Sequence, residues 1–369
     1  MKVSIGSKIV TGPWGGGNLF AINLSNFLIA HGHSVIYDLT DPDIDLILLT
    51  DPRSRSESSS TFNHEDIKQY KKYINPNVAV VQRINECDER KNTKNINEFY
   101  MNASMVSDHV VFVSTWLRDI YLNIGMSPEK SSVILAGANS NIFNPIGYEP
   151  YNNHSKIKLV THHWSSHNNK GFDVYKLIDE LISRDYWSER IEFTYIGNFP
   201  SELNFKNTKI IEPLAGIELA NEIKQNHIYV TASINEPSGN HHIEAAQCGL
   251  PILYKESGGI PEYCENFGVS FSDDFEKKLI EVIKRYDELR IKMSSYPFNS
   301  EKMCEEFLSL FNRELNNLDI SYTKTDINSF LKYLFIYKNK LFKFFRKIFS
   351  FSIRNRLSNI MKLIFKNDK

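Results

Sequence analysis

Short apolar runs and longer amphipathic stretches alternate along the first half of the chain. Residues 2–10 predict a strand and residues 11–18 a Gly-rich loop. Apolar side chains from Phe20 to Leu28 then recur at helical spacing, with Asn18 as the expected N-cap and Gly32 as the expected stop. Further strands are predicted at 34–37, 46–49, 78–81, 110–113 and 133–135, and helices at 65–73 and 116–124. Strands that alternate with helices indicate parallel pairing in a doubly wound α/β sheet.

The alternation stops in a polar, turn-rich stretch and then starts again. Residues 144–156 carry two prolines and predict a linker. Beyond it, strands are predicted at 157–160, 191–196, 228–231 and 251–254, and helices at 172–183, 217–224, 242–248, 275–286 and 300–316. We therefore expect two Rossmann-like, doubly wound domains that face a cleft, at 1–145 and 157–320, joined by a linker at 146–156.

The last 49 residues differ from the rest in charge. The 369-residue chain has a formal net charge of −1, but residues 1–320 carry 31 basic and 42 acidic groups, whereas 321–369 carry 12 and 2. Leu334, Leu341, Phe345 and Ile348 share one helical face, and the basic side chains lie mostly on the other. This pattern predicts a basic amphipathic helical tail that binds an anionic membrane surface. Packing on the body of the protein and an oligomer contact are the alternatives, and nucleic acid is not an expected partner.

Cysteine usage and the N-terminus favour a cytoplasmic protein. The four cysteines have no ligand-like spacing, and the first residues lack the long apolar stretch of a secretory signal. No stretch of the chain is both long enough and apolar enough to span a bilayer. We therefore expect reduced thiols and, at most, peripheral attachment to the inner face of a membrane.

The Gly-rich loop from Gly12 to Asn18 is the first candidate for ligand binding. It joins a strand to a helix, where backbone N–H groups favour anions, and glycines such as Gly16 and Gly17 let a phosphate or sugar approach the backbone. The loop matches neither the dinucleotide GxGxxG fingerprint nor the P-loop. A tight turn without a ligand is the alternative.

The segment from Ile234 to Glu262 carries the strongest signal. Glu236 follows a strand and Glu244 lies on the next helix, with seven residues and Gly239 between them. The two carboxylates therefore bracket a helix N-terminus at the carboxyl edge of a parallel sheet, where ligands bind in open α/β sheets. Carboxylates accept hydrogen bonds from hydroxyl groups and a helix N-terminus attracts phosphate, so a sugar nucleotide suits both. The alternative is an acidic cap with a solvated helix face.

This segment resembles the Glu-x7-Glu signature of retaining glycosyltransferases of the two-domain GT-B fold, in particular family 4 ("group 1"). The pattern Glu-x-x-Gly-x-x-x-x-Glu-Ala-Ala-x-x-Gly-Leu-Pro-Ile is followed by Ser257-Gly-Gly-Ile-Pro-Glu262. The glycine loop, Ser114-Thr-Trp, the segment 136–145, Lys170-Gly171 and Ile196-Gly197 occur in the family's order. The similarity covers about residues 1–318.

The resemblance implies roles for individual residues. Glu236 would be the catalytic residue that faces the sugar of the nucleotide-sugar, and Glu244 would hold the ribose hydroxyls. Gly239, Asn240 and His241 would lie against the sugar and diphosphate through their backbone. Lys170 would neutralise the diphosphate, a role that the negative charge of the leaving group also favours.

The sequence departs from the family's pattern just before Lys170. The family's Arg, about five residues before the Lys, is absent from Thr161-His-His-Trp-Ser-Ser-His167, so His162, His163 or His167 are candidate replacements. Two other patterns could suggest a metal site. His241 and His242 are adjacent on a predicted helix and point in different directions, so they do not easily share one ion. Asp41-Pro-Asp43 has an Asp-x-Asp spacing, but it lies early in the chain before a strand, and we expect no metal cofactor.

A charge-dense segment at 80–93 follows a strand in the first domain. The resemblance places it at the cleft, and Arg83, Asp88, Arg90 and Lys91 are candidates for the acceptor side. An exposed charged loop is the alternative.

The resemblance therefore implies a hexosyltransferase-type enzyme that transfers a sugar from a nucleotide-sugar to a glycan or lipid-linked acceptor in cell-surface polysaccharide or lipopolysaccharide synthesis, with retention of the anomeric configuration. A dinucleotide-dependent oxidoreductase and an inactive glycan-binding or scaffold homologue are the alternatives. No side-chain pattern in the sequence identifies the base of the nucleotide, the sugar of the donor or the acceptor.

Overall fold

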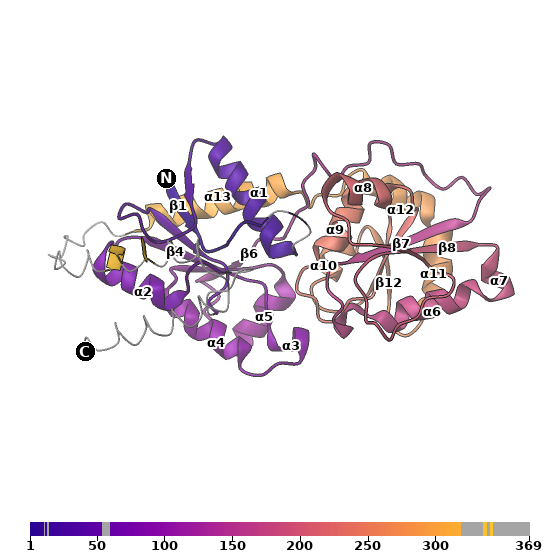
Figure 1. Cartoon of the computed structure of the whole chain (residues 1–369), viewed down its shortest axis with the longest axis horizontal. Coiled ribbons are helices and arrows are strands. Elements are labelled where there is room, and N and C mark those ends of the chain that lie inside the picture. The colour runs from indigo at the N-terminus through magenta and orange to yellow at the C-terminus, as the bar shows by residue number, and fades with distance from the viewer. Residues whose placement is uncertain (11, 13–14, 54–59, 319–334, 338–339, 342–369) are drawn as a thin grey trace.

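Two α/β domains lie side by side along the long axis of the molecule (Figure 1). The computed structural model describes the chain except residues 11, 13–14, 54–59, 319–334, 338–339 and 342–369. Each domain has a six-stranded sheet in which every neighbouring pair of strands is parallel. The doubly wound architecture expected from the sequence is therefore confirmed.

The first sheet has the strand order β2-β1-β3-β4-β5-β6. Its strands are β1 (Lys2–Ile5), β2 (Ser34–Ile36), β3 (Leu46–Leu49), β4 (Ala79–Ile84), β5 (His109–Phe112) and β6 (Ser131–Val133). The helices of this part of the chain are α1 (Gly16–Ala30), α2 (His64–Tyr73), α3 (Asp88–Lys91), α4 (Ile96–Ala103) and α5 (Thr115–Asn123), with a 3-10 turn, η1 (Ser104–Val106).

The second sheet has the strand order β12-β11-β10-β7-β8-β9. Its strands are β7 (Ile157–His163), β8 (Ile191–Gly197), β9 (Lys209–Ile211), β10 (Ile228–Thr231), β11 (Ile252–Lys255) and β12 (Gly268–Phe271). The remaining helices are η2 (Asn168–Lys170), α6 (Phe172–Ile182), α7 (Asp185–Ser188), α8 (Gly216–Lys224), α9 (Asn240–Gln247), α10 (Pro261–Cys264), α11 (Phe275–Lys284), α12 (Tyr286–Met293) and α13 (Ser300–Asn316).

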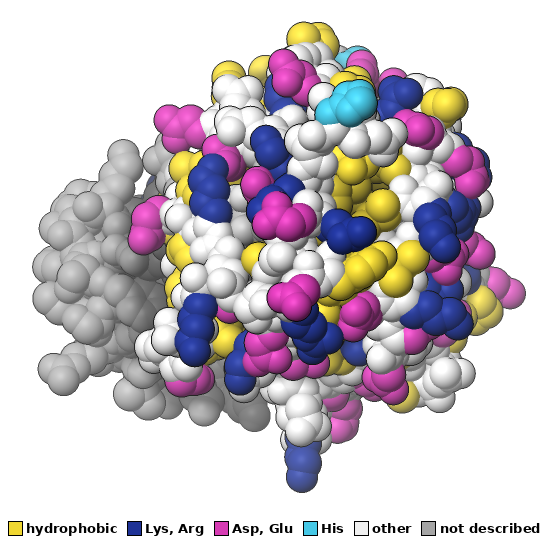
Figure 2. Space-filling view, turned by 90° about the vertical axis from the view of Figure 1, so that its right-hand side faces the viewer, with side chains coloured by type: hydrophobic (Ala, Val, Ile, Leu, Met, Phe, Trp, Pro, Cys, Tyr) yellow, Lys and Arg dark blue, Asp and Glu magenta, His cyan; other side chains and the backbone are white. Residues whose placement is uncertain are grey.

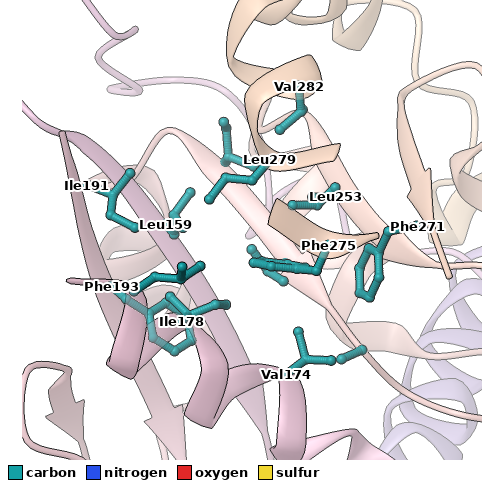
Figure 3. Packing of buried hydrophobic residues seen from close by; sticks show 14 of the residues in the cluster. Leu159, Val174, Ile178, Ile191, Phe193, Leu253, Phe271, Phe275, Leu279 and Val282 are labelled. Carbon is teal, nitrogen blue, oxygen red and sulfur yellow. The ribbon is translucent and has the colours of Figure 1, made fainter. Parts of the chain in front are cut away.

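Alternating apolar positions of the second sheet build the core beneath α6 and α11. Leu159 and Phe193 from the sheet meet Ile178 from α6, and Phe275 and Leu279 from α11 close the cluster (Figure 3). These side chains are almost fully buried, so the sheet is a rigid base for the loops that follow its strands.

The start of α1 differs from the sequence prediction. The helix begins at Gly16 with Gly15 as N-cap, so its cap lies three residues before the expected cap Asn18. The Asn18 side chain instead accepts a hydrogen bond from the Val10 backbone N–H at 2.9 Å and donates one to the Val10 carbonyl at 2.7 Å. The predicted stop is confirmed, because α1 ends at Ala30 and Gly32 has a φ of +80°.

Helix α13 packs on the first domain, not on the second. Its buried side chains Met303, Phe307 and Phe311 join the cluster around Val3 and Leu24 beneath the first sheet. The helix was predicted with the right bounds, but placing all of 157–320 in one domain was wrong for it. The apolar face of α13 completes the core of the first domain, although α13 follows the second domain in the sequence (Figure 1).

The chain therefore crosses between the domains twice, and the two crossings touch. Ser300 donates a backbone hydrogen bond to the Ala138 carbonyl at 2.7 Å, and Ala138 donates one to Phe298 at 3.3 Å. A Cβ on Gly137 would lie 2.0 Å from the Asn299 carbonyl oxygen, so only glycine allows this approach.

Most of the predicted tail lies outside the described residues. Within the described part, Phe335 is buried against Tyr70 of α2, with ring centroids 6.2 Å apart, and Ile336 packs on the same cluster. This contact favours the alternative of packing on the body for that part of the tail. No helix among the described residues has the length and apolarity needed to cross a membrane. Figure 2 shows the outer end of the second domain, where basic and acidic side chains are interleaved.

Candidate active site

The segments that follow β4, β7 and β10 meet between the two domains. Helix α3 follows β4, the turn η2 follows β7, and the loop with Glu236 follows β10. Asn169 of η2 donates a hydrogen bond from its side-chain amide to the Arg90 carbonyl at 3.1 Å, and Asn235 donates one to the Glu89 carbonyl at 3.0 Å. The site is therefore built from both domains at the carboxyl ends of parallel strands.

Glu236 lies between two cations from different domains. Its Oε2 is 2.5 Å from Lys170 Nζ, and its Oε1 is 3.0 Å from a guanidinium nitrogen of Arg90. The residue is only 2% exposed. Its backbone carbonyl accepts a hydrogen bond from Gly259 N–H at 2.9 Å, and a Cβ on Gly258, which has a φ of +65°, would come within 2.5 Å of that oxygen. The two glycines allow the close packing that fixes this carboxylate.

The two cations keep the buried Glu236 ionised. Burial alone would raise its pKa, but the charges of Lys170 and then Arg90 outweigh burial and lower the pKa to about 2. Burial acts to lower the pKa of Arg90, yet Glu236 and Glu86 raise it above the ordinary value. At neutral pH the site therefore holds a carboxylate between two positive charges.

Lys170 is positioned by a tight turn against β10. It ends η2 and is followed by Gly171, which has a φ of +76° and serves as the N-cap of α6. A Cβ on Gly171 would lie 2.1 Å from the Ala232 carbonyl oxygen, so the turn packs directly on the end of the neighbouring strand. The ammonium is buried beside Glu236 as a result.

Glu244, the other carboxylate of the Glu-x7-Glu pair, has a different partner. It lies on α9, and its Oε2 is 2.9 Å from His162 Nε2 at the end of β7. The other ring nitrogen of His162 is 3.2 Å from the Tyr229 hydroxyl. Of the candidates in the Thr161–His167 stretch, His162 is thus the one that contacts a carboxylate of the Glu-x7-Glu pair.

His163, His241 and His242 are buried and neutral, whereas the candidate His167 is exposed and its Nδ1 lies 2.8 Å from the Asn169 Oδ1. Burial first, and neighbouring positive or potentially positive groups second, lower the pKa of His163 and His241 well below the ordinary value. His241 contacts the Thr231 hydroxyl at 2.8 Å and His163 contacts the Tyr175 hydroxyl at 2.6 Å. His242 has a pKa of about 3 because of burial, and neither of its ring nitrogens has a hydrogen-bond partner. In the described part of the chain, no three side chains of metal-binding type form a group that could hold an ion.

Two helix N-termini face one another across the domain interface. A Cβ on Gly16, the first residue of α1, would lie 3.0 Å from the Asn240 Oδ1 at the start of α9, whereas one on Gly17 would have nothing within 4 Å. Neither N-cap residue, Gly15 or Gly239, supplies a side-chain cap. The backbone N–H groups of the first helical turns and the partial positive charge at both helix starts favour an anion between them.

The four acceptor-side candidates separate into different environments. The segment 80–93 is not an exposed loop, because it starts inside β4 and contains α3. Arg83 is buried in β4 with its guanidinium 4.1 Å from the centre of the Phe20 ring, and burial lowers its pKa to about 10. Lys91 is partly exposed and lies 3.6 Å from Glu86. Only Arg90 reaches Glu236.

Asp88 fixes the turn between α3 and α4. Its carboxylate accepts hydrogen bonds from the backbone N–H groups of Ile96 and Asn97, both at 3.0 Å, and from the Thr93 hydroxyl at 2.9 Å. In return, the Asp88 backbone N–H donates to the Asn97 side chain at 2.9 Å. This set of bonds points to a structural role for Asp88.

Sequence reasoning missed the contacts that hold the second domain on α5. Glu262 accepts hydrogen bonds from the backbone N–H groups of Thr115 and Trp116 at 2.8 and 2.9 Å. Tyr263 donates to the Val113 carbonyl at 2.6 Å. Glu262 and Ser114-Thr-Trp were both recognised as motifs, but motifs about 150 residues apart carry no signal that they touch.

The chain is similar to known proteins in sequence and in fold. No family model matches the chain. The chain is similar to the gpi3 subunit of phosphatidylinositol N-acetylglucosaminyltransferase of Schizosaccharomyces pombe, with 24% identity over 204 residues, 51% of this chain and 44% of that protein. It is similar to the corresponding subunit of Saccharomyces cerevisiae, with 25% identity over 255 residues, 62% of this chain and 54% of that protein. The chain thus spans about half the length of the curated relatives it matches.

Solved structures confirm the fold. A glycosyltransferase from Rickettsia africae superimposes with a TM-score of 0.60 and 15% identity, over 86% of this chain and 98% of that one. Anabaena HepE in complex with UDP and glucose superimposes with a TM-score of 0.59 and 14% identity, over 84% and 99%. The two parallel sheets of this chain have the arrangement of the GT-B fold.

Proposed function

We propose that this chain is a retaining glycosyltransferase, of the family 4 type, that transfers a hexose or N-acetylhexosamine from a nucleotide-sugar to a lipid-linked acceptor. The observation that carries the proposal is the buried, ionised Glu236 beside Lys170, in the loop that leads to the uncapped N-terminus of α9. Hydroxyl groups of a sugar suit the carboxylate, and a diphosphate suits the ammonium and the helix N-terminus. The curated relatives are named as N-acetylglucosaminyltransferases of phosphatidylinositol, which supports a lipid-linked acceptor.

The proposed reaction needs stabilisation of a leaving diphosphate more than a nucleophile. The bond between the sugar C1 and the diphosphate oxygen breaks, and its electron pair stays on that oxygen. The acceptor hydroxyl forms the new bond to C1 from the same face, and its proton passes to the departing oxygen. Lys170 and the N–H groups of α9 oppose the charge that develops on the diphosphate. Glu236 accepts hydrogen bonds from the sugar hydroxyls and holds C1 in place.

The proposal includes the location of the reaction. A lipid-linked acceptor requires the enzyme at a membrane surface, and the basic part of the tail beyond Leu341 would attach it peripherally to the cytoplasmic leaflet. The acceptor would then be a precursor of a cell-surface polysaccharide or lipopolysaccharide, or a related glycolipid.

Replacement of the carboxylate tests the activity. We expect transfer of radiolabelled sugar by the full-length Glu236→Gln variant to fall by about 100-fold or more. The glutamine amide accepts hydrogen bonds through one oxygen, whereas the carboxylate accepts them through two. Glu265→Gln, at an exposed position after α10, is the matched control and should retain activity. Thermal unfolding of both variants shows whether the fold is intact.

A panel of ligands identifies which nucleotide-sugar the protein binds. UDP-, GDP- and ADP-sugars are compared by the shift they cause in the unfolding temperature, with NAD as the comparison ligand. Stabilisation by a nucleoside diphosphate sugar is expected. Full transfer activity in Glu236→Gln, or stabilisation by NAD alone, would contradict the proposed function.

A further inference from the structure

Arg90 belongs to the first domain, yet it contacts the carboxylate that the second domain presents. Its guanidinium lies 3.0 Å from Glu236 Oε1, and Lys170 lies 2.5 Å from Oε2 of the same group. One carboxylate therefore bridges two cations, and each of its oxygens faces a different domain. The pair of cations carries one positive charge more than Glu236 neutralises.

The position of α3 is specified by the residues next to this pair. Asn169 precedes Lys170 and holds the Arg90 carbonyl, whereas Asn235 precedes Glu236 and holds the Glu89 carbonyl. Asn235 has a positive φ of 49°, so the loop adopts an unusual backbone conformation where it reaches α3. The turns that place Lys170 and Glu236 thus also dock α3, and Arg90 arrives in the site through the same contacts.

The opposite end of α3 is anchored within the first domain. Asp88 binds the backbone at the start of α4 through two N–H groups. Behind Arg90, the buried Glu86 lies 3.5 Å from its guanidinium, and Arg53 and Lys91 lie 3.9 and 3.6 Å from Glu86. The Arg90 Nε is buried and has no hydrogen-bond partner. The Arg90 side chain is thus held at the interface, and its Nε–H can still donate a hydrogen bond.

We propose that Arg90 reaches across the domain interface and binds the diphosphate of the nucleotide-sugar together with Lys170. Glu236 holds the two cations in place in the unliganded protein, and the diphosphate takes over this role when the ligand enters. The carboxylate is then free to accept the sugar hydroxyls. Because Arg90 and Lys170 come from different domains, the full charge on the diphosphate is neutralised only when the domains are closed. This inference rests on the proposed function.

The second cation of the diphosphate site would therefore come from the first domain. The stretch before Lys170 offers histidines and serines, of which His162 is engaged with Glu244 and His163 with Tyr175. A guanidinium suits a phosphate better than the His163 imidazole, whose pKa burial lowers, because it is always charged and presents several N–H groups in one plane. Arg90 is the group of this kind that the structure brings to Glu236.

The test compares a nucleoside diphosphate with its monophosphate. Titration calorimetry of the full-length protein with UDP and UMP, and with the guanosine and adenosine pairs if UDP does not bind, gives the affinity that the second phosphate adds. We expect Arg90→Ala to weaken diphosphate binding about 10- to 100-fold and to leave monophosphate binding within about twofold. Arg90→Lys should restore part of the loss, because it returns the charge without the planar N–H groups.

The controls separate this inference from the proposed function. Arg184→Ala removes an exposed arginine that pairs with Glu276 at 3.3 Å on the surface of the second domain, and this variant should bind the ligands as the wild type does. If the wild type binds no nucleoside diphosphate, the proposed function fails. Equal weakening of both ligands by Arg90→Ala, no weakening, or a change confined to the KM of the acceptor would overturn the role of Arg90 while leaving the function intact.

Discussion

At the residue scale, the state of Glu236 makes stability depend on pH in a defined direction. Its pKa is about 2 in the folded protein, below the ordinary value of 4.5, so the folded state binds fewer protons than the unfolded chain in acid. The stabilisation is complete above about pH 4.5 and is lost as the pH falls towards 2. The difference in unfolding free energy between the wild type and Glu236→Gln should shrink by about 2 kcal/mol between pH 6 and pH 3.

Urea unfolding at pH 6, 5, 4 and 3 measures this difference. The Gln variant keeps the shape of the side chain but does not titrate, so titrations elsewhere in the chain affect both proteins equally and cancel. A constant difference over the whole range would mean that Glu236 is not held ionised by Lys170 and Arg90.

The resemblance placed Glu236 and Lys170 together on the donor side, but the contact between Arg90 and Glu236 was not predicted. Glu236, Lys170 and Arg90 were all candidates, yet Arg90 was assigned to the acceptor side. Spacing along the chain reports which residues share a loop or a helix face, and it carries no information about which loops of two domains meet. The contacts of Asn169 and Asn235 with α3 depend on the same long-range geometry.

At the scale of elements, the turn between η2 and α6 should be sensitive to a single methyl group. Gly171→Ala adds a Cβ that would lie 2.1 Å from the Ala232 carbonyl oxygen, at a φ of +76°. We expect a loss of about 3 kcal/mol or more in unfolding free energy and weaker binding of the nucleoside diphosphate, because η2 must move away from β10 and take Lys170 with it.

Gly125→Ala separates the clash from the backbone strain. Gly125 also has a positive φ, of 105°, but a Cβ there would have nothing within 4 Å. This variant should lose only about 1 to 2 kcal/mol and bind the diphosphate normally. Urea unfolding and calorimetry check both variants, and equal losses in the two would show that the contact with Ala232 is unimportant.

The elements also show where periodicity stops being informative. The amphipathic pattern at 300–316 predicted α13 within its observed bounds, because one face is apolar. It could not predict which sheet that face covers, and the helix returns to the first domain. The short helix α3 has no apolar face with a helical period, so the charged segment gave no signal of a helix.

At the scale of the whole molecule, the two crossings and the interface contacts tie the domains to one another. Gly137 and Asn299 touch where both crossings pass, and Glu262 and Tyr263 bind the start of α5 from the second domain. Two parallel sheets in two domains were expected from the sequence, whereas the second crossing between the domains was not.

The tail makes the remaining prediction about the whole molecule. Residues 342–369 hold eight of the Lys and Arg residues of the predicted tail and one acidic residue, whereas Phe335 is already packed against Tyr70. Truncation after Leu341 should therefore abolish sedimentation with phosphatidylserine vesicles and leave the unfolding temperature unchanged, because it removes charge that anionic lipid attracts but no described core residue. Binding of the full chain should weaken with salt and be absent on phosphatidylcholine vesicles. A truncated protein that still sediments with the anionic vesicles would place the membrane contact elsewhere in the chain.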